Sequence, residues 1–156
     1  MSRPNDIQVS EHFKLCEFED QSDGHLVVLH PLTLERLELL HSALSEEIAH
    51  EIAIIVTCGT RTPRSNKQLG NRLGWTDDGG LVSRNSRHLP KFGGIAVDLY
   101  ALDKEVRVLV PTDRVAAIAK RFFDVVLDHY PTHIHVDLRD SAKPKGPDAK
   151  TSEPTQ

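Results

Sequence analysis

The chain has 156 residues, a formal net charge of −4, 38% hydrophobic residues and 27% charged residues. This composition is typical of one globular domain and not of a disordered chain. The acidic balance argues against a nucleic-acid-binding protein, for which a basic surface is expected. No stretch approaches the roughly 18 consecutive apolar residues that a membrane-spanning helix needs. We therefore expect a monomer that binds neither nucleic acid nor a membrane.

Both ends of the chain are polar. The N-terminus has no apolar run after its first basic residue, so no signal peptide is visible and we expect synthesis in the cytoplasm. We expect residues 1–11 to be a flexible segment and residues 141–156 to be a disordered polar tail, which leaves residues 12–140 for the folded domain. The two cysteines, Cys16 and Cys58, match no metal-binding spacing. We interpret them as free thiols, and a disulfide between them stays open.

Three segments are predicted to be helical. Leucine and isoleucine recur every three or four positions over residues 33–50, which is the spacing of an amphipathic helix. Residues 62–73 begin with Thr-Pro, which is typical of an N-cap followed by the first helical residue. A third helix is expected to begin at residues 112–113, a Thr-Asp pair suited to capping. Its apolar stripe would comprise Val115, Ile118, Ala119 and Phe122.

Short β-branched runs predict the strands. Residues 52–57 and 94–100 have the composition of buried strands, and residues 125–127 and 133–138 form a final pair. The glycine-containing residues 74–87 are predicted to be a long loop, and loops of that length are usually functional or mobile. This order of elements predicts an α+β fold, with a small, mostly antiparallel sheet and helices packed on one face.

The last predicted strand carries most of the chemistry. Because side chains alternate between the faces of a strand, His133, His135 and Asp137 share one face and apolar residues occupy the other. Asp98 lies in the middle of an otherwise apolar strand, which is costly unless the carboxylate is paired or coordinated. His88 ends the glycine-rich loop upstream. Two imidazoles and one carboxylate, with a fourth position for water, are a ligand set of catalytic zinc sites.

Four segments of the chain together resemble a known motif pattern. Residues 86–88 (Ser-Arg-His), 94–98 (Gly-Ile-Ala-Val-Asp) and 135–137 (His-Val-Asp) resemble the SxH, GxAxD and HxD motifs of the zinc D-alanyl-D-alanine carboxypeptidase family. Residues 57–63, with Asn66, resemble the SGYRSPxxN segment of that family. The family includes vancomycin-resistance dipeptidases and phage L-alanyl-D-glutamate endolysins, and it shares its fold with the hedgehog signalling domain.

The resemblance implies a zinc metallopeptidase that hydrolyses a peptide bond in peptidoglycan stem peptides, as a carboxypeptidase or as an endolysin-type endopeptidase. It implies zinc (Zn2+) ligation by His88, Asp98 and His135. It also implies a catalytic, substrate-facing guanidinium at Arg61, which is suited to bidentate contacts, and a substrate contact at Ser86. Without a signal peptide, such an enzyme is expected to reach the cell wall through a holin-type release or as a phage component.

Two features depart from the family pattern. The interval from His88 to Asp98 is longer than usual, because residues 90–92 lengthen the turn. An insertion between elements can leave both ligands in place. Thr132 occupies a position where many members have an acidic general base, and a threonine hydroxyl does not serve as a base near neutral pH.

Three side chains are candidates to replace that base. His133 is preferred, because a neutral imidazole accepts a proton near neutral pH. Asp137 is the second candidate, although it equally suits orienting His135 from behind, and Asp128 is the third. The missing acid also leaves open a catalytically inactive, zinc-containing binding module of the same fold. A structural protein without a metal is a further alternative.

Overall fold

The structure, a computed structural model, describes residues 3–143. Its sheet has the strand order β1-β2-β5-β4, all neighbours antiparallel, and a short strand β3 pairs with β2 outside this path. The predicted α+β class with a small antiparallel sheet is confirmed. The strands are β1 (Ile52–Cys58), β2 (Ala96–Asp103), β3 (Val108–Leu109), β4 (Val125–Leu127) and β5 (Ile134–Asp137).

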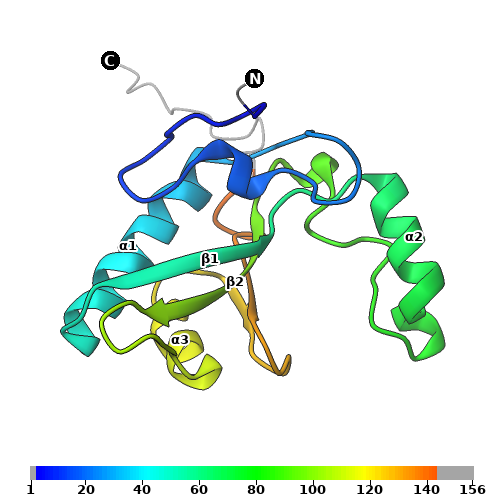
Figure 1. The fold of residues 1–156 in the computed structure, drawn as a ribbon. Helices are drawn as coiled ribbons and strands as arrows, with labels where there is room; N and C mark the ends of the chain where they lie inside the picture. Colours follow the sequence, from blue (N-terminus) through cyan, green and yellow to red (C-terminus); the bar gives the residue numbers. More distant parts are fainter. Residues whose placement is uncertain (1–2, 144–156) are drawn as a thin grey trace, which may run out of the picture.

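Of the three α-helices within residues 3–143, two cover one face of the sheet (Figure 1). Helices α1 (Pro31–Ile48) and α3 (Thr112–Ala119) pack against the strands and against each other, whereas α2 (Pro63–Leu73) lies beyond the end of β1. None of the helices within residues 3–143 has both the length and the apolar composition needed to cross a membrane. Three short 3-10 helices complete the described elements: η1 (Leu15–Phe18), η2 (Thr76–Asp78) and η3 (Pro90–Phe92).

The core lies between the helices and this sheet face. Leu37, Leu40 and Leu44 of α1 are fully buried, which is the stripe that the helical spacing predicts. Burying one such side chain stabilises the fold by about 1.5–3 kcal/mol. Alternate residues of the central strands enter the same core, and the intervening residues therefore face the opposite side. These core strand residues are Ile52, Ile54, Val97, Leu99, Ile134 and Val136.

Helix α1 begins two residues before the predicted start. The Nδ1 atom of His30 accepts the backbone N–H of Leu32 at 3.0 Å, so an imidazole acts as the N-cap and Pro31 takes the first helical position. Histidine is not among the residues that usually signal an N-cap, which explains the misplaced start. Helix α3 ends at Ala119, and Phe122 packs against the core from the turn that follows.

Strand β2 continues three residues beyond its predicted end at residue 100, and β3 was not predicted at all. Val108 and Leu109 are 59% and 57% exposed, so β3 has no buried face. A two-residue exposed strand carries no alternation of apolar and polar residues from which it could be recognised.

The N-terminal segment makes specific contacts with the domain. The Arg3 guanidinium donates to the Glu19 carboxylate at 2.6 Å, and the Asn5 carbonyl accepts the N–H of Cys16 at 2.9 Å. Arg3 and Asn5 therefore contact the domain, while the flexibility of residues 1–11 and the domain boundary at residue 12 stay predictions. Of the expected tail, residues 144–156 lie outside the described residues.

The two cysteines are free thiols, so the disulfide that the sequence left open is not formed. Cys16 is buried beside the N-terminal segment, and Cys58 is half-buried at the end of β1.

Candidate metal centre

The sheet register brings Asp98 and His135 together. Asp98 of β2 and His135 of β5 are directly paired residues of neighbouring antiparallel strands, so their side chains lie on the same face. This face is opposite to the one that carries the buried Val97 and Val136. The core therefore determines the direction of both polar side chains, as the alternation in the sequence predicts.

His88 reaches the same place from the loop between α2 and β2. Its Nδ1 atom donates to the Gly59 carbonyl at 2.8 Å, which leaves Nε2 as the nitrogen that faces Asp98. The residues that lengthen the interval to Asp98 form η3 and lie outside the site. The turn closes at Gly94, which has a φ of +77° and approaches the carbonyl oxygen of Val28 so closely that a Cβ would lie 2.4 Å from it. The insertion therefore leaves His88 and Asp98, the candidate ligands on either side of it, close together.

Three candidate ligand atoms converge in this arrangement. His88 Nε2 and His135 Nδ1 lie 3.1 and 2.9 Å from Asp98 Oδ1, and the two nitrogens are 3.2 Å apart. Tetrahedral zinc with bonds of about 2.0–2.1 Å separates its nitrogen and oxygen ligands by about 3.3 Å. Each imidazole also has its second nitrogen engaged by an acceptor elsewhere, Gly59 or Asp137. The donor set and its spacing therefore fit a zinc ion.

His88, Asp98 and His135 strongly affect one another's pKa values. Burial disfavours the charged form of His88, but its interactions with the Cys58 sulfur and the Asp98 carboxylate outweigh this and raise the pKa of His88 to about 10. Burial would raise the pKa of Asp98, yet the hydrogen bonds from His135 and His88 hold it well below its usual range. Ligating imidazoles and carboxylates are deprotonated, so a metal ion would take the place of the protons that hold this cluster together.

Asp137 lies behind His135 with respect to the three ligand atoms. Its Oδ2 accepts from His135 Nε2 at 2.9 Å, and its carboxylate is bidentate to Arg139 at 2.9 and 2.7 Å. The side chain of Asp137 is fully buried. Of the two roles that the sequence left open, this geometry favours orientation of His135 over proton transfer at the metal. Its assignment as a catalytic residue stays a prediction.

Asp137→Asn is therefore expected to lower zinc affinity by about 10–100-fold, the usual cost of losing such an outer partner. The variant tests orientation because an amide accepts the His135 proton less well and pairs poorly with the Arg139 guanidinium. Zinc affinity is measured by competition with a chromophoric chelator. Asp140→Asn, a change of an exposed carboxylate close by in sequence, is the control. Unchanged affinity in Asp137→Asn would argue against the orienting role.

His133 stands at the open side of the centre. Its Nε2 lies 3.9 Å from Asp98 Oδ2, and its side chain is 25% exposed, whereas the three ligand side chains are nearly buried. The Thr132 hydroxyl lies 3.1 Å from His133 Nδ1, so the residue at the expected acid position holds the imidazole instead. Asp128, the third candidate base, is exposed.

Tyr130 also lies at the centre, although no pattern in the sequence marks it as a site residue. Its ring stacks on His133 with centroids 4.6 Å apart, and it is half-buried. Burial and then the negative charge of Asp98 raise the pKa of Tyr130, so the phenol stays protonated beside the centre. In the sequence, Tyr130 stands just before Pro131 between the last two predicted strands, and that position does not indicate a stacking partner.

Arg61 and Ser86 are brought together beside the ligands. Arg61 Nη1 lies 3.4 Å from both the Ser86 hydroxyl and the Asn66 amide oxygen. The backbone N–H of Arg61 donates to the His88 carbonyl at 2.9 Å, which fastens the end of β1 to the ligand-bearing loop. Ser86 is buried, and its hydroxyl also accepts from the His88 N–H at 3.4 Å. Substrate contact by either residue stays a prediction.

A buried carboxylate holds the Arg61 segment in place. Asp20 Oδ2 accepts the N–H of Thr62 at 2.7 Å, and its Oδ1 accepts two N–H groups of its own turn and the Ser65 hydroxyl. Thr62 in turn caps α2, as predicted, by accepting the N–H of Ser65 at 3.1 Å. Burial alone would raise the pKa of Asp20, but these hydrogen bonds outweigh it and lower the pKa below its ordinary value.

We expect Asp20→Asn to lower the free energy of unfolding at pH 7 by about 1–3 kcal/mol, because the amide nitrogen leaves a buried N–H unpaired. Because the pKa of Asp20 is lower in the folded state, its contribution to the free energy of unfolding decreases as the pH falls. The stabilisation is fully present above the unfolded-state pKa of about 3.9 and is lost as the pH falls through the folded-state pKa. Urea unfolding at pH 7 and pH 3 tests this: the difference from wild type should shrink at pH 3. Exposed Asp77→Asn is the control, with little change at either pH.

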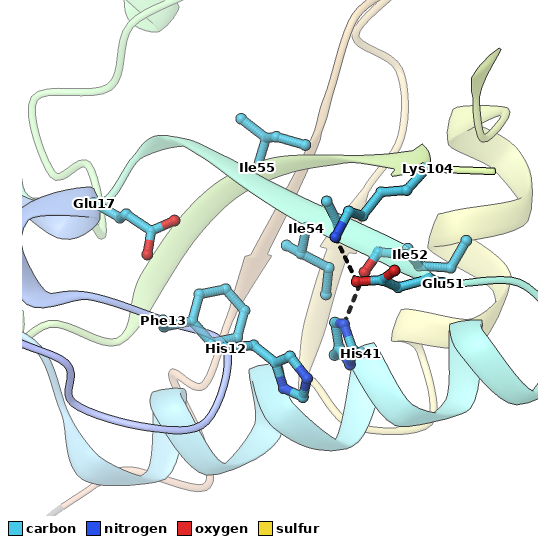
Figure 2. A pocket seen from close by; sticks show the side chains of 10 residues that line it. His12, Phe13, Glu17, His41, Glu51, Ile52, Ile54, Ile55 and Lys104 are labelled. Carbon is cyan, nitrogen blue, oxygen red and sulfur yellow. Dashed lines mark hydrogen bonds and ion pairs between the residues drawn. The ribbon is translucent and has the colours of Figure 1, made fainter. Parts of the chain in front are cut away.

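A cavity of about 330 Å³ lies elsewhere, between the N-terminal segment, α1 and β1 (Figure 2). Beside it, His12, Glu38 and His41 place candidate ligand atoms within 4.8 Å of one another. The two imidazoles are stacked with centroids 3.6 Å apart, so their nitrogen lone pairs lie in nearly parallel planes and do not converge. His12 is also paired with Glu38 at 2.6 Å, and His41 with the Ile52 carbonyl at 2.8 Å. We assign no metal to this cluster.

The chain has a weak likeness to a solved structure. No family model matches the chain, and no curated protein matches it. Among solved structures, the crystal structure of the Serratia marcescens L-Ala D-Glu endopeptidase ChiX is similar at 17% sequence identity, with a TM-score of 0.38. The match covers 80% of this chain and 100% of that chain. The kinship to zinc D-alanyl-D-alanine carboxypeptidases that the sequence motifs imply therefore stays a prediction.

Proposed function

We propose that this protein is a zinc-dependent peptidase that hydrolyses a peptide bond in peptidoglycan stem peptides. The observation that carries the proposal is the convergence of His88 Nε2, Asp98 Oδ1 and His135 Nδ1 at mutual distances of 2.9–3.2 Å. Three ligands of this kind leave a coordination position free, which is the arrangement of catalytic zinc sites. The substrate class rests on the motif resemblance of the residues around them.

The side chains around the ligands support amide hydrolysis. When bound, zinc would acidify a water molecule and polarise the scissile carbonyl. His133, at the open side of the centre, would accept the proton of the attacking water through Nε2 and pass it to the leaving amine. The half-buried Arg61 would hold a carboxylate or carbonyl of the peptide. Asp137 would keep His135 in the tautomer whose Nδ1 faces the metal.

A zinc-containing binding module without hydrolytic activity is the second candidate. Thr132 favours it, because this residue stands where many relatives of the predicted family have their acidic base. The two candidates share the metal centre and differ only in turnover. Zinc binding alone therefore supports both.

Digestion of purified peptidoglycan separates them. We expect about one zinc per chain by elemental analysis, clearing of a peptidoglycan suspension, and peptide products whose masses identify the bond that is cut. A chelator should stop the clearing and added zinc should restore it. A zinc content far below one per chain, together with clearing that survives chelation, contradicts the proposal. Bound zinc and wall binding without any product support the binding module instead.

A further inference from the structure

Cys58 is brought into line with two of the candidate ligands by an irregularity in β1. The pairing of β1 with β2 shifts between Val56 and Cys58, so that Val56 pairs with Leu99 and Cys58 pairs with Asp98. Without that bulge at Thr57, the threonine would stand opposite Asp98. Asp98 pairs in turn with His135. Cys58, Asp98 and His135 therefore form a row across three strands on the face away from the core.

The thiol of Cys58 lies among polar atoms of the centre. Its Sγ, a nitrogen of His88 and a carboxylate oxygen of Asp98 all lie within 4.8 Å of one another. Sγ is 3.6 Å from His88 Nδ1, and Arg61 Nη2 approaches it at 3.5 Å. The side chain is half-buried and is therefore partly open to solvent. Within residues 3–143, Cys16 is not among the side chains whose candidate ligand atoms gather at this centre.

We infer that Cys58 is a fourth ligand within reach of the metal, so that its thiolate and a water molecule compete for one coordination position. The inference rests on the zinc centre of the proposed function and adds a regulation of it. With bonds of about 2.3 Å to sulfur and about 2.0–2.1 Å to nitrogen, tetrahedral zinc needs a sulfur–nitrogen separation of about 3.6 Å. Zinc–oxygen bonds are about as long as zinc–nitrogen bonds, and Sγ lies no more than 4.8 Å from a carboxylate oxygen of Asp98, so the sulfur has to close a gap of about 1 Å at most toward that oxygen. A change of χ1 rotamer displaces the sulfur by more than this.

The consequence is a centre with two forms. With the thiolate bound, the ligand set is Cys58, His88, Asp98 and His135, and the site is closed like a structural zinc site. The thiol proton is released to solvent when sulfur binds, because a coordinating thiol is deprotonated. When sulfur turns away, the fourth position is free for water, as catalysis requires. The resting protein is expected to be the closed form, with substrate or water displacing the thiolate.

X-ray absorption at the zinc edge tests this in the wild-type protein without any substitution. We expect about one sulfur scatterer per zinc at about 2.3 Å, and none in Cys58→Ser. Cobalt-substituted protein should show a thiolate-to-cobalt charge-transfer band in the near ultraviolet. This band should be lost in both Cys58→Ser and Cys58→Ala and retained in the control Cys16→Ser.

The possible outcomes distinguish a failure of this inference from a failure of the proposed function on which it rests. Bound metal with only nitrogen and oxygen scatterers, or a charge-transfer band that survives loss of Cys58, overturns the fourth ligand and leaves the peptidase proposal intact. Sulfur ligation without peptidoglycan hydrolysis supports the fourth ligand and contradicts the peptidase. A protein that binds neither zinc nor cobalt overturns both.

Discussion

Replacing His135 with alanine is expected to empty the zinc centre and to abolish hydrolysis of peptidoglycan. His135 Nδ1 is one corner of the triangle of ligand atoms, at 2.9 and 3.2 Å from its partners, and alanine offers no atom in its place. The loss in zinc affinity should exceed the roughly 10–100-fold expected for the outer partner Asp137. Zinc content after dialysis and the rate of clearing measure the two effects together.

The matched control for this variant is His50→Ala. His50 pairs with Asp103 at the far end of β2, so its loss removes an imidazole from the surface without touching the centre. We expect normal zinc content and clearing from it. If His135→Ala keeps about one zinc per chain, the assignment of the ligand is wrong, whatever the activity of that variant. Far-ultraviolet circular dichroism of both variants checks that the fold is retained.

Replacing His133 with alanine is expected to separate metal binding from catalysis. The side chain is 25% exposed, and its Nε2 lies 3.9 Å from Asp98 Oδ2, close enough to serve the centre without belonging to the triangle of ligand atoms. Loss of a general base typically costs about 10²–10⁴-fold in rate. We therefore expect that reduction in kcat with unchanged zinc content, measured on a soluble stem peptide.

Asp128→Asn tests the competing base and serves as the control. Asp128 is exposed, and we expect its replacement to leave both zinc content and kcat close to wild type. A drop in kcat for Asp128→Asn with full activity in His133→Ala would reverse the assignment of the base. Activity in both variants would direct attention to Tyr130, the protonated phenol that stacks on His133.

Much of the site followed from local patterns in the sequence. The alternation in β2 and β5 was sufficient to predict that Asp98 and His135 turn away from the core, because side chains along a strand repeat with a period of two. The cost of an unpaired buried carboxylate pointed to a partner for Asp98 before that partner was known. Thr62 and Pro63 likewise marked the start of α2 through local capping chemistry.

Other features depended on contacts between distant parts of the chain. Three features have weak signals in the local sequence, and each is stabilised by its surroundings in the fold. They are the cap of α1 by His30, the contact of Arg3 with Glu19, and the pairing of β2 with β3. The stacking of Tyr130 on His133 belongs to the same group. Local propensity does not contain this information, because the free energy comes from partners that are far away in sequence.

Local patterns in the sequence were sufficient to predict the types of the candidate ligands and the faces they occupy: two imidazoles and a carboxylate on strands or loops whose other residues form the core. The register of the strands that carry them comes from the tertiary structure. It pairs Asp98 with His135 across 37 residues, and it shifts β1 by one bulge so that Cys58, and not Thr57, stands opposite Asp98. The physical reason is that strand pairing is a long-range choice made by the packing of the whole sheet, and a shift of one residue changes which side chain reaches the metal centre.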